Sequence, residues 1–292
     1  MAAEPRIALI TDSGTNTPRE IVEREGVYCA YLSVNYRNEQ FREVVEISTQ
    51  EVYERFAQEI PQTSTPSPRE VVECIEQAVS DGYTQLLCVL TSSGLSSTCS
   101  LFQSVLAGRP EGQAHVVDTK SIGAGGGISV VYAAELIEQG LPFEEVCALV
   151  DRAAARSHVY FLVDTLDNLY KGGRINKAVY SLGSVLNLKP VITCNLTGHY
   201  VVAAKARGRA KALIKQIDLV RKDVADAARY RIGFASGITP DRAKLFARVR
   251  ETFPDAEWVR DFGDVSPALI THTGHTATAL LHRLVVDRKS VV

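Results

Sequence analysis

The sequence predicts an α/β protein in which a mostly parallel sheet with flanking helices precedes a second domain of α+β type. In the first half, short apolar runs that suit buried strands alternate with segments whose apolar residues recur at helical spacing. In the second half, Asn195-Leu-Thr-Gly198 separates two strand-like runs and indicates a β-hairpin. We expect the domain boundary near residue 155, so that residues 1–155 form the first domain and residues 156–292 the second.

The elements of the first half have local signals. Arg6–Ile10 is a short buried strand, and Thr17-Pro18 indicates a helix with Thr17 as its N-cap and proline in its first turn. Ser67-Pro-Arg-Glu70 is a capping box that begins a second helix, which ends at Asp81-Gly82. The other expected elements are a strand over Gln85–Leu90, a helix over Ser96–Leu106, a strand over Ala114–Val117 and a helix over Ile128–Gln139.

The second half mixes hairpin strands with helices. Lys189–Cys194 and His199–Lys205 flank the hairpin turn. Ala268–Thr271 is expected as the final strand, followed by a closing helix. The other expected elements are a helix at 143–156, a strand over His158–Val163, a short helix over Thr165–Tyr170, a helix over Ala210–Ala228, a strand over Arg231–Ala235 and a helix from Thr239-Pro240.

Composition argues against several classes of protein. The 32 basic and 34 acidic residues are interspersed and give a formal charge of −2, so nucleic acid is not an expected partner. The chain has no apolar run of transmembrane length, and its start does not resemble a signal peptide. The six cysteines are scattered without C-x-x-C pairs, as buried thiols in a reducing compartment are. We therefore expect a cytoplasmic protein with no integral membrane association.

Two hydroxyl-rich segments, residues 62–68 and 91–98, are the main candidate for a binding site. Each leads into an expected helix, whose N-terminus offers free N–H groups and a partial positive charge that suit a carboxylate or a phosphate. In the first segment Ser67 is accounted for by its capping box, so Thr63 and Ser64 are the better ligand candidates. Ser92 and Ser93 directly follow a buried strand, where hydroxyls need not serve as caps.

The position of these segments supports a ligand site. The loops Thr11–Gly14, Thr91–Ser97 and Asp118–Gly127 all follow expected parallel strands. In open α/β sheets, ligands bind beyond the carboxyl ends of the strands. Any one of these loops could be a capped loop without a ligand, and their shared position and hydroxyl content favour a site.

Basic groups of the second domain could meet an anion there. His272 lies at an expected strand end, where it either forms a local hydrogen bond or contacts a carboxylate held by the first domain. Arg207, within Lys205-Ala-Arg-Gly-Arg209, either faces the anion or forms a solvated edge. Lys171-Gly-Gly-Arg174 lies between two expected helices, where glycines permit close approach and basic side chains suit a phosphate-bearing ligand or an acidic partner.

Other chemistries have weaker support. Gly123-Ala-Gly-Gly-Gly127 does not complete G-x-G-x-x-G because Ile128 occupies the last position, so close backbone packing explains it more simply than a dinucleotide. Neither a P-loop nor the G-x-S-x-G pattern of a serine nucleophile occurs. His272 and His275 could ligate a metal, yet no third ligand is evident. We expect neither a metal nor a cofactor.

Taken together, these segments resemble the DegV family of bacterial fatty-acid-binding proteins. The matching segments follow the family's order across nearly the whole chain. They are Thr11-Asp12-Ser13, Thr63-Ser-Thr-Pro-Ser-Pro68, Ser92-Ser-Gly-Leu-Ser96, Val117-Asp-Thr119, Lys171-Gly-Gly-Arg-Ile175, Leu188-Lys-Pro190, Lys205-Ala-Arg207 and His272-Thr-Gly274. Two segments depart from the family pattern: H-T-G-P-G is His272-Thr-Gly-His-Thr276 here, and S-G-T is Ser96-Ser-Thr98.

The resemblance implies a two-domain DegV-like fold with a long-chain fatty acid at the domain interface. It also implies a non-catalytic subunit of a fatty acid kinase system, in which a separate ATP-dependent subunit phosphorylates the acyl carboxylate to an acyl phosphate for phospholipid synthesis. The implied carboxylate-binding residues are Thr63, Ser64, Ser92, Ser93, Arg207 and His272. The implied docking residues for the kinase are Gly172, Gly173 and Arg174.

The residues are consistent with this function, because hydroxyls and a histidine can hold a desolvated carboxylate without placing a full counter-charge beside it. An alternative is an enzyme that acts on a small phosphorylated or carboxylated substrate in the same cleft. A third interpretation is a nucleotide-binding regulator, which thermal stabilisation by nucleotide would support.

Overall fold

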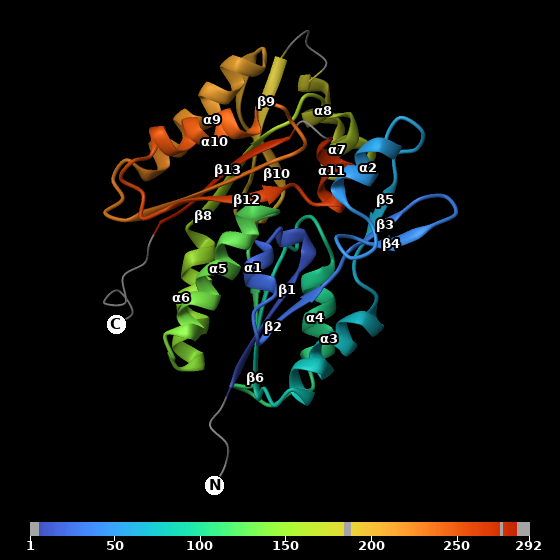
Figure 1. The fold of residues 1–292 in the computed structure, drawn as a ribbon, viewed down its shortest axis with the longest axis vertical. Helices are drawn as coiled ribbons and strands as arrows, with labels where there is room; N and C mark the ends of the chain where they lie inside the picture. The colour runs from blue at the N-terminus through green and yellow to red at the C-terminus, as the bar shows by residue number, and fades with distance from the viewer. Residues whose placement is uncertain (1–5, 184–187, 275–276, 285–292) are drawn as a thin grey trace.

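The computed structural model describes residues 6–183, 188–274 and 277–284. The first half alternates strands and helices, and the second half adds a hairpin and further strands (Figure 1). In chain order the elements are β1 (Ile7–Asp12), η1 (Ser13–Thr15), α1 (Arg19–Val22), β2 (Val27–Ala30), β3 (Ser33–Asn35), β4 (Gln40–Arg42), α2 (Thr49–Arg55), β5 (Gln62–Ser64), α3 (Pro68–Ser80), β6 (Gln85–Leu90), α4 (Thr98–Leu106), β7 (Ala114–Asp118), α5 (Ala124–Glu138), α6 (Phe143–Ala155), β8 (Ser157–Leu162), α7 (Asp167–Lys171), α8 (Lys177–Gly183), β9 (Leu188–Cys194), β10 (Tyr200–Arg207), α9 (Arg209–Val224), β11 (Tyr230–Ser236), α10 (Arg242–Thr252), β12 (Val259–Asp264), α11 (Pro267–Thr273) and β13 (Thr278–Leu284).

The first domain contains the predicted parallel sheet, in the strand order β2-β1-β6-β7. Its strands read as continuous apolar runs, because α3 and α4 cover one face and α5 covers the other. Leu90 at the end of β6 is paired with Asp118 at the end of β7. The loops that follow β1, β6 and β7 therefore leave the sheet at the same edge, as the sequence predicts.

The second domain contains a mixed sheet in the order β10-β9-β8-β13-β11-β12. The β9–β10 hairpin is confirmed, with Tyr200 paired to Cys194 across the turn. Helix α9 contacts β8, β9, β10 and β13, and helix α10 contacts β11 and β12. Helix α5 contacts β8, β11 and β13. Figure 1 shows α9 and α10 above this sheet and α5 between it and the parallel sheet.

Helix α5 is shared by both sheets, which explains its composition. It is buried on nearly all sides, as a helix enclosed between two sheets must be. The glycine run lies in its first turn, where a Cβ on Gly127 would lie 2.6 Å from the carbonyl oxygen of Thr15 and one on Gly125 would lie 2.7 Å from Cβ of Val159. Close packing against both domains therefore requires these glycines.

The last elements of the chain correct the sequence analysis. Residues 268–271 lie in helix α11, which begins after Ser266 with Pro267 in its first turn, and the closing element is strand β13 between β8 and β11. Both predictions were wrong because short apolar runs do not distinguish a helix from a strand. The first helix begins at Arg19 with Pro18 as its N-cap, so Thr17 does not cap it.

The sequence analysis also missed a small antiparallel sheet, β4-β3-β5, and helix α2. The strands of this sheet are only three residues long, too short to show alternation. Helix α11 contacts β3, β5, α2 and α7, and so joins this sheet to the second domain. These contacts bring β5, with Thr63 and Ser64, to the side of His272.

Candidate functional site

A polar cavity lies where β5 and the loop after β6 meet α11 and the loop between α7 and α8. Its empty volume is about 1270 Å³. The residues predicted from the sequence that line it are Thr63, Ser64, Ser93, Arg174 and His272. Ser64, Ser93, Ser97 and Ser100 are exposed lining residues, so the cavity is open to solvent.

Thr63 and His272 meet at this cavity although 209 residues separate them. Nε2 of His272 lies 2.7 Å from Oγ1 of Thr63. Burial, assisted by the positive charge of Arg174, lowers the pKa of His272 to about 3. At neutral pH the imidazole is therefore uncharged, and it acts as a hydrogen-bonding group and not as a counter-charge.

The glycine-rich loop lies directly against this histidine. A Cβ on Gly172 would overlap Nδ1 of His272, so the ring occupies the space that a side chain would need. Gly173 has φ +73°, in the left-handed region that favours glycine. Nη1 of Arg174 donates a hydrogen bond of 2.6 Å to the carbonyl oxygen of Gly172, which closes the loop.

The two predicted arginines have different positions. Arg174 is half-buried and lines the polar cavity, and burial lowers the pKa of its guanidinium. Among the described residues it has no carboxylate partner at ion-pair distance. Arg207 is exposed at the end of β10, opposite Leu188, and does not line the cavity. The structure therefore brings Arg174, and not Arg207, to the other site residues.

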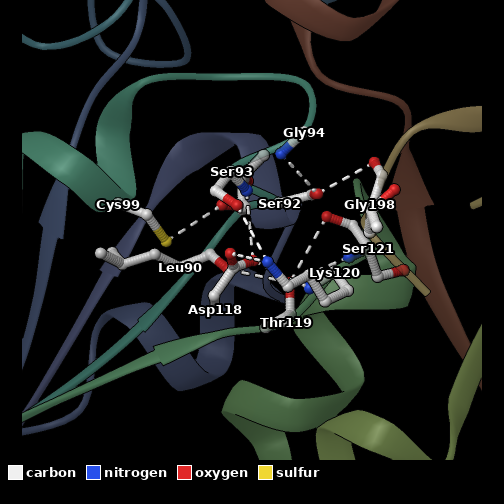
Figure 2. Close-up of polar contacts among 12 residues, drawn as sticks. Leu90, Ser92, Ser93, Gly94, Cys99, Asp118, Thr119, Lys120, Ser121 and Gly198 are labelled. Atoms are coloured by element: carbon white, nitrogen blue, oxygen red, sulfur yellow. Dashed lines mark hydrogen bonds and ion pairs between the residues drawn. The ribbon is translucent and has the colours of Figure 1, made fainter. Parts of the chain in front are cut away.

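Ser93 is held by the loop after β7 (Figure 2). Its amide donates to Oδ1 of Asp118 at 3.1 Å, and its Oγ accepts a hydrogen bond of 3.0 Å from Nζ of Lys120. Burial opposes ionisation of Asp118, but hydrogen bonds from Lys120 and Ser93 outweigh burial and lower its pKa. Ser64 lies across the cavity, where its Oγ accepts a hydrogen bond from Asn35.

Ser92 has a different environment from Ser93. It is fully buried and does not line the cavity. Its Oγ donates to the carbonyl oxygen of Gly198 at 3.0 Å and accepts from the amide of Gly94 at 3.1 Å, as Figure 2 shows. Ser92 thus joins the loop after β6 to the β9–β10 turn, across the two domains.

Asp12 supports the same loop from the neighbouring strand. Its carboxylate accepts hydrogen bonds from the amide and hydroxyl of Thr91 and from the amide of Gly14. Burial raises its pKa to about 6 in spite of these donors. Asp12 does not line the polar cavity, so its contacts position the Thr91–Ser97 loop.

A second, apolar cavity lies beside the polar one. Its wall is apolar and combines Ile122 from the first domain with Val159 and Phe161 from the second. Ile122, Tyr200 and Leu269 line both cavities. The site therefore suits a molecule with a polar head and an apolar chain.

The sequence analysis missed several of these residues. Tyr200 and Leu269 carried no signal, because an aromatic or aliphatic residue in an apolar run usually belongs to the core. Asp118 and Lys120 lie in a loop that the sequence placed at the site, but their contact with Ser93 needs the pairing of β6 with β7. Glu43 is a further missed residue, because its contact with the amide of Ala268 joins positions 225 apart in the sequence.

Within residues 6–183, 188–274 and 277–284, no group of three or more His, Cys, Asp or Glu side chains could hold a metal ion. No helix of the same residues has the length and apolar character needed to cross a bilayer. His275 and Thr276, where the sequence departs from the DegV pattern, lie outside the described residues.

Comparison with known proteins identifies the family. Residues 6–283 match the family model described as an uncharacterised protein of the DegV family. A DegV domain-containing protein of Clostridium acetobutylicum is 30% identical over 92% of this chain and 95% of its own length.

Solved structures give the same result. A fatty-acid-binding DegV family protein from Thermus thermophilus has a TM-score of 0.87 and 30% identity over 96% of this chain and 99% of its own. DegV, a fatty-acid-binding protein from Bacillus subtilis, has a TM-score of 0.83 and 26% identity over the same shares of the two chains, 96% and 99%. The fold, the order of the motifs and these matches agree, and the chain belongs to the DegV family.

Proposed function

We propose that this protein binds a long-chain fatty acid between its two domains and presents the carboxylate to a separate kinase subunit. The observation that carries this proposal is that a polar and an apolar cavity lie side by side, with Ile122, Tyr200 and Leu269 in the lining of both. An acyl chain in the apolar cavity gains about 0.8 kcal/mol for each buried methylene. Its carboxylate, once removed from water, needs hydrogen bonds, which the polar cavity can supply.

The proposed carboxylate ligands lie on both sides of the polar cavity. Thr63 and Ser64 belong to β5, Ser93 follows β6, and His272 ends α11. The fatty-acid-binding relatives from Thermus thermophilus and Bacillus subtilis support this ligand class. We place the domain boundary at residue 155, so that residues 1–155 and 156–292 each contribute one wall.

The proposed partner is an ATP-dependent fatty acid kinase in the cytoplasm, and the acyl phosphate would serve phospholipid synthesis. A neutral His272 supports this role, because it holds the carboxylate by a hydrogen bond and adds no positive charge to that of Arg174, which would make the carboxylate less nucleophilic. The exposed hydroxyls at the mouth of the cavity leave the head group accessible. The loop Gly172-Gly-Arg174 connects this head-group site to the surface and is the proposed docking element.

Solvent extraction of the purified protein followed by mass spectrometry tests the binding function. We expect about one long-chain fatty acid per chain, reduced in Ser93→Ala and retained in Ser104→Ala, an exposed serine on α4 away from the cavity. A protein that stays empty after incubation with a range of fatty acids contradicts the proposal. That result would favour the alternative, an enzyme that acts on a small phosphorylated or carboxylated substrate.

The kinase role needs a separate experiment. The lipid-loaded protein is incubated with ATP, with and without a fatty acid kinase subunit, and acyl phosphate is trapped with hydroxylamine. We expect hydroxamate only when the kinase subunit is present. Formation of hydroxamate by the isolated chain would show that the protein is itself catalytic.

A further inference from the structure

Asn16 is one of the few polar residues in the wall of the apolar cavity. It follows η1 and has φ +48° and ψ +39°, a left-handed conformation that asparagine adopts more readily than most residues. It does not line the polar cavity, so it lies away from the proposed head-group site. Among the described residues, it alone lines both the apolar cavity and a third cavity.

The third cavity is open to solvent, since its lining includes exposed residues such as Arg19 and Val44. Val22 and Phe262 add further apolar surface to it. Because Asn16 belongs to the lining of both spaces, its side chain is a barrier between the apolar cavity and a cavity that water can enter.

The Asn16 side chain is fixed by the second domain. Its Oδ1 accepts a hydrogen bond of 2.7 Å from the amide of Ser266, and its Nδ2 donates one of 3.3 Å to the carbonyl oxygen of Phe262. These partners lie 250 and 246 positions away in the sequence. Since both ends of the amide are bonded to backbone groups, the side chain can stand in an apolar wall without leaving a polar end unpaired.

We propose that Asn16 closes the apolar cavity at the end away from the carboxylate, and that it thereby sets the greatest length of acyl chain that the protein accepts. The inference rests on the proposed fatty-acid function. Each further methylene of a bound chain adds to affinity only while the protein removes it from water. A chain that reaches Asn16 has no more apolar space, and a longer chain must displace the amide and break its two hydrogen bonds.

The test measures the affinities of saturated fatty acids from lauric to behenic acid, by displacement of a fluorescent fatty acid. For the wild-type protein we expect affinity to rise with chain length up to a limit and then to fall. Asn16→Gly removes the barrier without backbone strain, because glycine adopts a positive φ readily. It should raise the limit by about two carbons or more, with a gain in affinity of up to about fourfold for each methylene that enters the opened space.

Two control variants separate the barrier from other effects. Asn16→Asp keeps the size of the side chain and the acceptor for the Ser266 amide, so it should keep the wild-type limit. Asn38→Gly changes an exposed asparagine between β3 and β4 that lines none of the three cavities, and should bind as the wild type does. If Asn16→Gly has no cooperative urea transition, Asn16→Ser takes its place with the same expected shift.

Two results would overturn the inference. The first is an unchanged limit in Asn16→Gly, whether affinity falls equally for all chain lengths or for none, since Asn16 would then only join the two domains. The second is a shift in Asn16→Asp as large as in Asn16→Gly, since the size of the side chain would then not set the limit. Failure of the wild-type protein to bind any of these acids contradicts the proposed function itself.

Discussion

The carboxylate of Glu43 accepts a hydrogen bond of 2.7 Å from the amide of Ala268, although 225 residues separate them. Its other oxygen accepts the hydroxyl of Ser13 at 2.5 Å, and Glu43 is fully buried. Ala268 lies in the first turn of α11, and His272 follows one turn later. Because the Glu43 carboxyl accepts a backbone N–H that has no partner within the first turn of α11, it fixes the helix that carries His272.

Glu43→Ala should destabilise the protein, because it leaves the Ala268 amide and the Ser13 hydroxyl without this acceptor. Each such loss costs about 1–3 kcal/mol, so we expect the free energy of unfolding to fall by roughly 2–6 kcal/mol. Urea denaturation followed by circular dichroism measures this. Glu46→Ala is the control, because Glu46 forms an exposed ion pair with Arg42 and should cost less than about 1 kcal/mol. Similar effects of the two variants would contradict this assignment.

Gly172→Ala should weaken fatty-acid binding, because the new methyl group would overlap the imidazole of His272. The φ of Gly172 is −74°, so alanine causes no backbone strain there, and its main clash is with the ring, with a lesser contact of 3.0 Å to the carbonyl oxygen of Asn168. We expect a loss of affinity of about tenfold or more, the consequence of a displaced hydrogen-bonding group. Titration with a fluorescent fatty acid measures it. Gly108→Ala, with no atom within 4 Å of its new Cβ, should bind as the wild type does.

Substitutions of the adjacent residues Ser92 and Ser93 should have different effects, one on stability and the other on fatty-acid binding. Ser92→Ala removes a buried hydroxyl that bonds Gly198 and Gly94, and should lower the free energy of unfolding by about 1–3 kcal/mol. Ser93→Ala changes an exposed residue, so its unfolding should shift by no more than about 0.5 kcal/mol while fatty-acid affinity falls. Chemical denaturation and lipid titration of both variants check the pair. If Ser93→Ala lowered the free energy of unfolding and Ser92→Ala did not, the prediction would be contradicted.

Arg174 and Arg207 should differ in their effect on lipid affinity. Arg174 lines the cavity, and a bound carboxylate would offset the burial of its charge. Arg174→Met should therefore weaken fatty-acid binding by about tenfold or more. Arg207→Met should change it less than about twofold, because Arg207 lies outside the cavity. Displacement titrations at low and high salt measure both, and a larger effect at Arg207 would contradict the geometry.

Asp12 should make stability fall as pH rises through the weakly acidic range. Burial raises its pKa from 3.8 to about 6, so between these values the unfolded chain releases the proton before the folded protein does. The resulting loss in the free energy of unfolding is absent below pH about 4 and complete above pH about 6. It is on the order of 3 kcal/mol.

Asp12→Asn lacks this titration. Its free energy of unfolding minus that of the wild type should therefore rise by the same amount across the window. Urea denaturation of both proteins at several pH values measures this difference in the free energy of unfolding. A difference that does not depend on pH would show that burial does not raise the pKa of Asp12.

Local signals account for the parts of the structure that the sequence predicts correctly. The capping box of α3 needs only Ser67 and Glu70, three residues apart, and it is present as predicted. Strand β6 coincides with its apolar run Gln85–Leu90, and the hairpin turn follows from Asn195 to Gly198. The loops of the site could be placed because parallel strands end at one edge of their sheet.

The sequence by itself therefore determined the α/β alternation, the capping box of α3, the hairpin and the hydroxyl-rich loops, since each depends on residues within a few positions of one another. Only the tertiary structure decided that residues 268–271 are helical, that Ser93 lines the polar cavity while Ser92 is buried outside it, and that Arg174 lines the cavity while Arg207 does not. Contacts such as Thr63 with His272 join residues that meet only when both domains pack. Periodicity and capping act along the chain, whereas these contacts depend on which surfaces the two domains bury against each other.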